Sequence, residues 1–405
     1  MRVVQINAVY GAGSTGSTAI ELAEGLRARG HFAYAFYASG TASYPNSARI
    51  GNVLDHKAHA LLSRLTGLQG YFSHLATRRM LKQLEALKPD VVHLRNLHAN
   101  YINLGMLLRW LAKNDIAVAL TLHDCWWMTG KCIHYTPARC EKWKTRCGPC
   151  PLIRLDTENP TWFFDRTRKC FSDKKQWFDA IPRLEVACVS QWIAGEAKQS
   201  MFRNREPIAI YNWIDRAVFF PRNADALREQ HQWGGSFVVL MVTNQLAERK
   251  GYRELLGLAE RLPEDCKLVV AGRNDLGLSL PARVTHIPHI ADGNALAALY
   301  SAADVCVNTT RFEAFGKVTA EALCCGTPVI VYNNTASPEL VGPGCGSVVD
   351  EAEGVDGVAK AVERVRQNGK AFYSRDCLAF TKDRFSLEQG VEAYIRLYRS
   401  LMEKR

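Results

Sequence analysis

One stretch, residues 304–332, most constrains what this chain can fold into. Asp304–Asn308 reads as a strand, a loop and a helix follow, and Gly326 can end that helix. Pro328–Tyr332 then reads as the next strand. A strand–loop–helix–strand unit is the repeating piece of a parallel sheet, and such sheets bind ligands at the carboxyl ends of their strands. The stretch therefore predicts an α/β protein with a binding site in this loop.

Charged side chains within the stretch indicate what the loop could bind. Lys317 lies near the helix N-terminus, where the dipole disfavours a cation, and a bound phosphate would reverse that cost. Glu313 falls in the loop, and Glu321, about a turn into the helix, could accept hydrogen bonds from a pair of sugar hydroxyls. The pattern also fits a solvated lysine and a glutamate that merely suits an early helical turn.

The same residues carry a family resemblance. Glu313 and Glu321, with Phe315-Gly316 between them and Cys325–Val329 after them, resemble the donor-site signature of glycosyltransferase family 4. These are retaining enzymes of the GT-B fold, so the resemblance implies two doubly wound Rossmann-like domains facing a cleft. It further implies that Glu321 binds the ribose of a sugar nucleotide and that Glu313 contacts the transferred sugar. The backbone of Phe315–Lys317 would face the donor sugar and its phosphates.

The length of 405 residues also favours two domains, each able to bury its own core. We expect an N-terminal, acceptor-side Rossmann-like domain over 1–212 with a cysteine-rich, basic insertion near 125–180. The donor-binding domain is expected over 213–385. The resemblance implies that a C-terminal helix, 386–405, packs back on the first domain.

Two places in the first domain are candidates for ligand contact. Gly13 and Gly16 lie in a glycine-rich loop that opens a helix, which suits a diphosphate, although a tight turn alone would also need glycine. His123 ends the strand 117–122, and Asp124 is available to orient its imidazole. A histidine in this position is often structural, but the resemblance implies that it faces the donor sugar.

The second domain offers a further phosphate-binding loop over 243–251. The family pattern has a lysine before a glycine, which Lys250 supplies, and an arginine early in the loop, where Asn244 or Gln245 stands instead. Arg249 could substitute for that arginine. The predicted catalytic residues are His123, Lys250 and Glu313, and the predicted donor-binding residues are Gly13, Gly16, Asn244, Arg249, Lys250, Phe315, Gly316, Lys317 and Glu321.

Thirteen cysteines, an odd number without a secretory signal, favour a reducing cytoplasm over a disulfide framework. Cys132, Cys140, Cys147 and Cys150 could bind a structural zinc ion, with His134 as a reserve ligand. Buried free thiols or a labile disulfide are the alternatives. All-cysteine sites are closed, so we expect no metal or other cofactor to be required for catalysis.

The formal net charge of +11 is concentrated in the first domain, where ten lysines and arginines lie between Arg139 and Lys175. Residues 161–178 are predicted to form a basic helix with aromatic residues at both ends. Such a helix can lie on an anionic membrane, or it can be a solvated face with an aromatic core stripe. We expect a cytoplasmic protein bound peripherally to the inner membrane face.

The sequence therefore predicts a retaining glycosyltransferase, similar to bacterial capsule and colanic-acid transferases. It would move a hexose-type sugar from a UDP- or GDP-linked donor to a hydroxyl of a polyprenyl-diphosphate-linked glycan acceptor in polysaccharide biosynthesis. One alternative is a non-catalytic sugar-nucleotide-binding protein. Another is a basic, zinc-containing nucleic-acid-binding protein, although we expect no nucleic-acid partner. A dehydrogenase would need a glycine fingerprint next to its strand, which the first domain lacks.

Overall fold

The computed structural model describes residues 1–40, 44–155 and 160–404. Residues 41–43, 156–159 and 405 lie outside the described residues; the second group falls in the predicted cysteine-rich insertion and Arg405 in the predicted C-terminal helix. The chain forms two compact units. Unit 1 comprises Met1–Tyr211 and Gly390–Arg405, and unit 2 comprises Asn212–Gln389.

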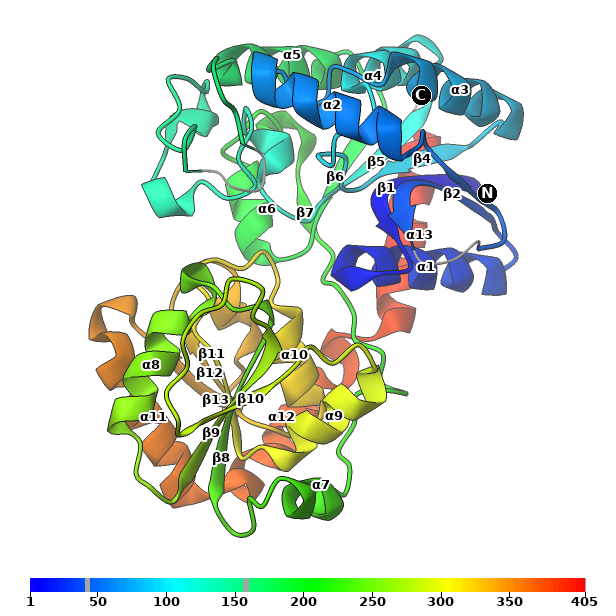
Figure 1. Ribbon diagram of the computed structural model, residues 1–405. Coiled ribbons are helices and arrows are strands. Elements are labelled where there is room, and N and C mark those ends of the chain that lie inside the picture. The colour runs from blue at the N-terminus through cyan, green and yellow to red at the C-terminus, as the bar shows by residue number, and fades with distance from the viewer. Residues whose placement is uncertain (41–43, 156–159, 405) are drawn as a thin grey trace. The chain divides into compact units, whose positions relative to one another are not determined.

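Unit 1 is built on a seven-stranded parallel sheet with the order β3-β2-β1-β4-β5-β6-β7 (Figure 1). Strands β4 and β5 are buried along their whole length, as expected for a parallel sheet covered on both faces. The strands are β1 (Arg2–Tyr10), β2 (Phe32–Gly40), β3 (Ser47–Arg49), β4 (Val91–Leu94), β5 (Ala117–Leu122), β6 (Leu184–Cys188) and β7 (Ile208–Ala209).

Helices cover both faces of this sheet. Helices α3, α4 and α5 pack side by side on one face, and α1 and α13 lie together on the other, where Gly25 of α1 contacts Val391 of α13. The helices are α1 (Gly13–Ala28), α2 (Val53–Thr66), α3 (His74–Leu87), α4 (Leu104–Lys113), α5 (Thr167–Asp179), α6 (Gln191–Ala197) and α13 (Leu387–Glu403).

Helix α13 closes unit 1 from the far end of the chain. The Tyr398 hydroxyl lies 2.8 Å from His93 Nδ1, and the Tyr394 hydroxyl lies 2.9 Å from Thr121 Oγ1. Both tyrosines are buried, so their hydroxyl groups would carry a desolvation cost without these partners. The helix is thus fixed to β4 and β5 by specific contacts as well as by its apolar face.

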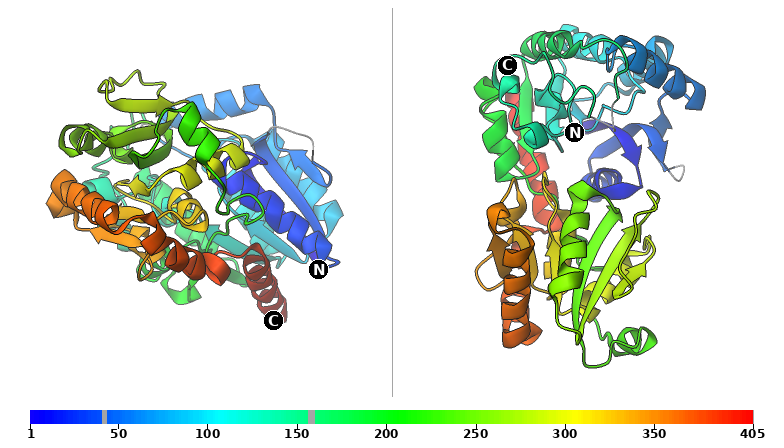
Figure 2. Two further views of the ribbon diagram at one scale, coloured as in Figure 1. Left: turned by 90° about the horizontal axis from the view of Figure 1, so that it is seen from below. Right: turned by 60° about the vertical axis from the view of Figure 1, so that its left-hand side comes forward.

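Unit 2 repeats the architecture with a six-stranded parallel sheet of order β10-β9-β8-β11-β12-β13. Helices α8 and α11 pack together on one face and α9, α10 and α12 on the other (Figures 1 and 2). The strands are β8 (Phe237–Gln245), β9 (Cys266–Arg273), β10 (Val284–Ile287), β11 (Val305–Asn308), β12 (Val329–Tyr332) and β13 (Gly346–Val349). The helices are α7 (Asp225–Gln230), α8 (Tyr252–Arg261), α9 (Gly293–Ala302), α10 (Lys317–Cys324), α11 (Gly354–Asn368) and α12 (Lys370–Arg384).

The predicted helix over 161–178 is wrong in its first turns. Helix α5 begins only at Thr167, after its N-cap Arg166. Just before it, Asp165 accepts hydrogen bonds from the backbone N–H and the hydroxyl of Thr167, which hold the chain in a local turn. Trp162–Phe164 precede the helix as irregular, exposed chain, whereas Phe171, Trp177 and Phe178 are buried. None of the helices in the described ranges combines the length and apolar character needed to cross a bilayer.

Candidate active site

The site of unit 2 lies where the strand order reverses, at the carboxyl ends of β8 and β11. The chain leaves β8 through a 3-10 turn, Glu248–Lys250, and enters α8 at Gly251. Gly251 has a φ of +87°, and a Cβ there would come within 2.3 Å of Thr309 Oγ1. Only glycine fits this close approach to the β11 loop, and the approach places Lys250 beside that loop.

Lys250 and Glu313 meet directly. Lys250 Nζ lies 2.9 Å from Glu313 Oε1, and both side chains are about one-fifth exposed. The Glu313 loop is held in turn by its backbone N–H, which donates to Thr335 Oγ1 at 2.9 Å. The two catalytic residues predicted in this unit are therefore neighbours, and the pair remains open to a ligand from the solvent side.

Helix α10 starts next to this pair. Its N-cap is Gly316, with a φ of +95°, and no side chain caps the helix at this end. The N-terminal N–H groups of α10 carry partial positive charge, which favours an anion near Lys317. Phe315 is buried with its ring against Phe385, so the backbone of Phe315, rather than its side chain, can contact a ligand.

Glu321 is not a solvated helix residue. It is only 7% exposed and accepts a hydrogen bond of 3.1 Å from the Tyr300 hydroxyl. Burial raises its pKa to about 7, against the opposing effects of Lys317 and Tyr300. A buried carboxyl group with a strongly raised pKa beside a positively charged loop is typical of a functional site.

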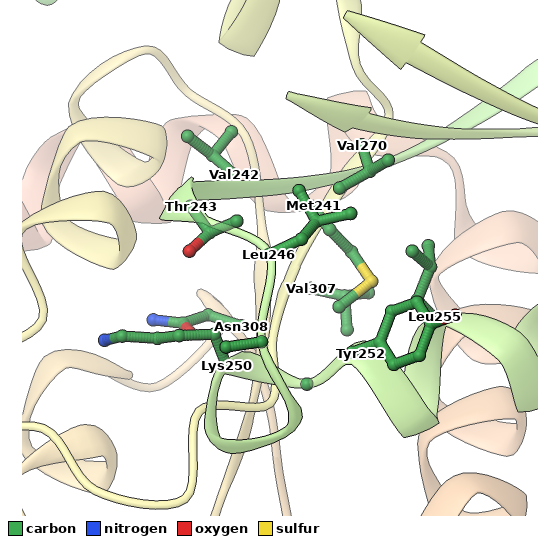
Figure 3. Close-up of a pocket in the computed structure, with 12 residues that line it drawn as sticks. Met241, Val242, Thr243, Leu246, Lys250, Tyr252, Leu255, Val270, Val307 and Asn308 are labelled. Carbon is green, nitrogen blue, oxygen red and sulfur yellow. The ribbon is translucent and has the colours of Figure 1, made fainter. Parts of the chain in front are cut away.

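A narrow hollow of about 10 Å³ lies behind the β8 loop (Figure 3). Thr243, Lys250 and Asn308 bring polar atoms to one side of it, while Met241, Val270 and Leu255 line the other. Asn308 is held by its amide group, which donates to Thr319 Oγ1 at 3.0 Å. The hollow is far smaller than a ligand pocket, so it is a gap behind the loop rather than a binding site for a whole donor.

Asn244, which stands near the place of the missing arginine, and Arg249, the suggested substitute, are both exposed. Asn244 uses its backbone carbonyl to accept a 3.1 Å hydrogen bond from Arg273 Nε, and the carbonyl of Arg249 accepts from the N–H of Arg311. Arg273 ends β9, next to β8 in the sheet, and was not singled out from the sequence. The sequence feature that could have indicated Arg273 is the position of a basic residue at the carboxyl end of a strand.

In unit 1 the two glycines have different surroundings. Gly13, the first residue of α1, has a φ of +64° and open space where a Cβ would lie. Gly16 is buried, and a Cβ there would lie 3.3 Å from the Val9 carbonyl oxygen. Gly13 is therefore placed to contact a ligand, while close packing of α1 on β1 is a sufficient reason for glycine at position 16.

The expected pairing of Asp124 with His123 is wrong. Asp124 Oδ2 lies 3.2 Å from Nε2 of His98, and Asp124 also accepts from the N–H of Trp126 at 2.8 Å. Burial acts to raise the pKa of Asp124, but His98 and these hydrogen bonds bring it below its usual value. His98 follows β4, and the packing that joins it to the β5 loop is not visible in the sequence spacing.

His123 lies beside this pair at the end of β5. It is 8% exposed, and its Nε2 has no hydrogen-bond partner among the described residues. Burial lowers the pKa of His123 well below its usual value, so the imidazole is neutral at neutral pH. A buried, unpartnered ring nitrogen carries a desolvation cost that a bound hydroxyl group would remove.

Family models match nearly the whole chain. A model described as Glycosyltransferase Family 4 matches residues 15–218, and one described as Glycosyl transferases group 1 matches residues 223–376. The chain belongs to glycosyltransferase family 4. The resemblance seen in the donor motif is thereby confirmed.

Curated relatives of this family 4 glycosyltransferase include a putative colanic acid biosynthesis glycosyl transferase, WcaC, of Escherichia coli strain K12. It is 25% identical over 427 residues, which cover 99% of this chain and all of the relative. A GDP-mannose-dependent phosphatidylinositol dimannoside mannosyltransferase of Mycobacterium tuberculosis is 29% identical over 160 residues, covering 38% of this chain and 42% of the relative.

Solved structures confirm the GT-B fold of this family 4 enzyme. Sucrose-phosphate synthase of Thermosynechococcus elongatus matches with a TM-score of 0.72 at 18% identity, covering 99% of both chains. HepE of Anabaena in complex with UDP matches with a TM-score of 0.69 at 17% identity, covering 99% of this chain and all of that one.

In this family 4 glycosyltransferase the cysteine-rich segment follows β5 in unit 1. All thirteen cysteines, each within the described ranges, are free thiols. Cys132, Cys140, Cys147 and Cys150 line one hollow together with Lys131, and the N–H of Gly130 donates to Cys147 Sγ at 3.1 Å. In residues 1–40, 44–155 and 160–404, however, no three potential metal ligands, His134 included, lie close enough together to hold an ion. The predicted zinc site is thus not preformed, and zinc binding stays a prediction.

Proposed function

We propose that this glycosyltransferase moves a sugar from a UDP- or GDP-linked donor to a hydroxyl group of a lipid-linked glycan, with retention of the anomeric configuration. The observation that carries the proposal is the Lys250–Glu313 pair beside the uncapped N-terminus of α10. Together they offer a cation, helix N–H groups and a carboxylate at one strand end, which are the groups that a diphosphate and a sugar require.

Each donor-site residue then has a role. Lys250 and the N-terminus of α10 stabilise the negative charge that builds on the leaving diphosphate. Glu321 accepts hydrogen bonds from the ribose hydroxyls, and Glu313 binds the sugar. The HepE structures with UDP and with UDP-glucose support a nucleotide-sugar donor.

The proposed reaction course is supported by the chemistry of these groups. Glu313 is paired with Lys250 and Glu321 is buried against Tyr300, so neither carboxylate is placed as a free covalent nucleophile. We therefore favour attack of the acceptor on the face that the diphosphate leaves, with the diphosphate oxygen taking the acceptor proton. His123 Nε2 would bind a hydroxyl group of the donor sugar or of the acceptor.

The acceptor class rests on the relatives. The full-length match is named for colanic acid biosynthesis, and the mycobacterial relative is named for a phosphatidylinositol dimannoside substrate. Polysaccharide assembly on a polyprenyl diphosphate carrier is consistent with both, because the acceptor then bears a sugar on a lipid. The coarse assignment as a glycosyltransferase does not depend on this choice.

A panel of UDP- and GDP-sugars tests the proposal. Product formation is followed by mass spectrometry with a lipid-linked glycan mixture, and the anomeric configuration of the product is read by NMR. We expect one donor to give product with the configuration of the donor. Turnover with inversion would overturn the proposed reaction course, and absence of turnover with every donor would overturn the enzyme activity.

A non-catalytic sugar-nucleotide-binding protein is the second candidate, because Asn244 stands where the family has an arginine. Arg273, bonded to the Asn244 carbonyl, offers a replacement cation. Replacing Arg273→Ala should lower kcat roughly tenfold if it assists the leaving diphosphate, with Arg249→Ala as the matched comparison. Donor binding without turnover in the unmodified protein would favour the second candidate.

A further inference from the structure

Helix α2 in unit 1 turns polar residues toward the protein and apolar residues toward solvent. Its buried residues are His59 and Ser63, which are polar, whereas Leu54, Leu61 and Leu62 point to solvent. Leu54 is 76% exposed, and the spacing of the three leucines places them on one side of the helix. A helix of a soluble protein normally turns such a stripe toward the core, so this exposed stripe indicates a partner.

The buried side of α2 makes specific contacts with the segment before α3. His59 Nδ1 lies 2.7 Å from Ser73 Oγ, and the His59 ring packs edge-on against Phe72. Asn52 and Asp55 form a reciprocal capping box at the first turn, and Gly67 ends the helix in the left-handed region. The orientation of α2 is therefore fixed at both ends, and its leucines are held outward.

A second apolar element lies against the end of this helix. The N–H of Trp162 donates to the carbonyl of Arg64 at 2.8 Å, and a Cβ at Gly67 would collide with the Phe164 carbonyl. Trp162, Phe163 and Phe164 are all exposed, Phe163 by 63%. We call the surface made by Leu54, Leu61, Leu62, Trp162, Phe163 and Phe164 the α2 face.

Basic side chains accompany these apolar groups. The guanidinium of Arg64 lies over the Trp162 ring and that of Arg166 over the Phe164 ring, and Lys57 is exposed on α2. Arg154 donates to the carbonyl of Trp162. Asp55 and Asp165, two acids in the described parts of these segments, accept hydrogen bonds from backbone N–H groups. The surface is thus apolar with a cationic border.

The basic stretch singled out from the sequence is a poorer membrane contact. Lys174 is buried and donates to the Trp126 carbonyl at 2.6 Å, so it cannot reach a membrane. Lys169 and Lys175 are paired with Asp173 and Asp179 along α5. The surface that fits a lipid is therefore formed by α2 and the aromatic segment before α5, rather than by α5 itself.

We propose that the α2 face docks on an anionic membrane, with its leucines and aromatic rings inserted at the headgroup boundary. Leucine, tryptophan and phenylalanine beside arginine and lysine are the combination that an interfacial helix uses. A second copy of the chain would bring the same basic border against itself, whereas anionic lipid complements it. The choice rests on the proposed lipid-linked acceptor, because an enzyme with such an acceptor must work at a bilayer surface.

Sedimentation with vesicles tests the docking. Vesicles of phosphatidylcholine with and without phosphatidylglycerol are compared at low and high salt, using the full chain and the variant Leu61→Ser, Leu62→Ser, Phe163→Ser. We expect the full chain to bind anionic vesicles and release in high salt, and the variant to bind at least roughly tenfold more weakly. The matched control is Leu276→Ser, Phe372→Ser, two exposed apolar residues of unit 2, which should bind like the unmodified chain.

Other outcomes would overturn the proposal. Equal binding by the variant would remove the α2 face from membrane contact, and a concentration-dependent dimer lost in the variant would make a second copy the occupant. Circular dichroism and turnover of a water-soluble acceptor glycoside should be the same in the variant and the unmodified chain. Soluble-acceptor turnover without vesicle binding contradicts the docking alone, and vesicle binding without any turnover contradicts the proposed function alone.

Discussion

Two loops of unit 2, which carry Lys250 and Glu313 and are called the donor loops for their proposed role, are positioned differently from the cysteine-rich segment of unit 1 (residues 125–155 and 160–166). Each donor loop leaves a strand and enters a helix, so the sheet itself brings Lys250 and Glu313 together. The segment has short 3-10 turns, and its described part is held by side-chain packing around the buried Trp126, Trp127 and Trp143. Regular alternation of strands and helices lets the positions of candidate functional residues be predicted from sequence. The positions of residues in irregular, packed loops cannot be predicted in this way.

The largest effect on catalysis is expected from Lys250→Met, which removes the cation at the contact between the two donor loops. The leaving diphosphate would lose its cation in a site of restricted solvent access, and loss of one such group typically lowers kcat by about 10²–10³-fold. Steady-state kinetics with the cognate donor measure this. Lys360→Met, on the exposed side of α11, is the control and should leave kcat unchanged. A loss of less than a few-fold in kcat would remove Lys250 from catalysis.

A smaller and pH-dependent effect is expected from Glu321→Gln. Because burial raises the pKa of Glu321 to about 7, the folded protein holds a proton there that the unfolded chain has released. The stability contribution is full at low pH and is lost as pH rises through about 7, while donor binding, which needs the carboxylate, should strengthen over the same range. In the variant, donor affinity should fall roughly 10–100-fold and both pH dependences should flatten.

Calorimetry and thermal unfolding between about pH 5 and about pH 8 measure both quantities. Glu264→Gln, an exposed glutamate of the same unit, is the control and should keep the pH dependence of the unmodified chain. A donor affinity that is equal in Glu321→Gln and the unmodified chain at every pH would mean that the ribose binds elsewhere.

The cysteine-rich segment is predicted to be held by a zinc ion as well as by side-chain packing. We predict about one zinc ion per chain by elemental analysis, with the thiols closing on the ion from the hollow that they line, and loss of zinc in Cys147→Ser, Cys150→Ser. The double variant should also unfold at a lower temperature, whereas Cys266→Ser in unit 2 should keep its metal content. Metal-free, fully stable protein would make these thiols ordinary packing residues.

The sequence predicted well the elements that carry the proposed donor site, because their residues follow a periodic pattern. The strand before Glu313 and the helix that carries Glu321 were both identified from local spacing, and GT-B architecture followed from the resemblance. The sequence could not reveal that Asp124 pairs with His98, since that contact joins loops after two different strands. The burial of Lys174 was hidden for the same reason, because its partner, the Trp126 carbonyl, lies far away in the sequence.

The outward stripe of α2 shows a second limit. Its apolar spacing is that of an amphipathic helix, and nothing local states which side faces the protein. That choice is made by His59 and Ser73, whose contact is tertiary. Sequence patterns thus predict that a helix is present more readily than they predict which of its sides faces the protein.

The packing of α13 on β4 and β5 has a consequence for biosynthesis. Unit 1 is interrupted by the whole of unit 2, Asn212–Gln389, and is completed only by the residues from Gly390 onward. At a translation rate of about 5–20 residues per second, the ribosome needs roughly 10–35 s to make this interruption. During that interval the sheet of unit 1 has no Tyr394 or Tyr398 to contact Thr121 and His93. A nascent chain that stalls before Tyr394 would therefore present a partly uncovered apolar sheet face, a substrate for chaperones and proteases.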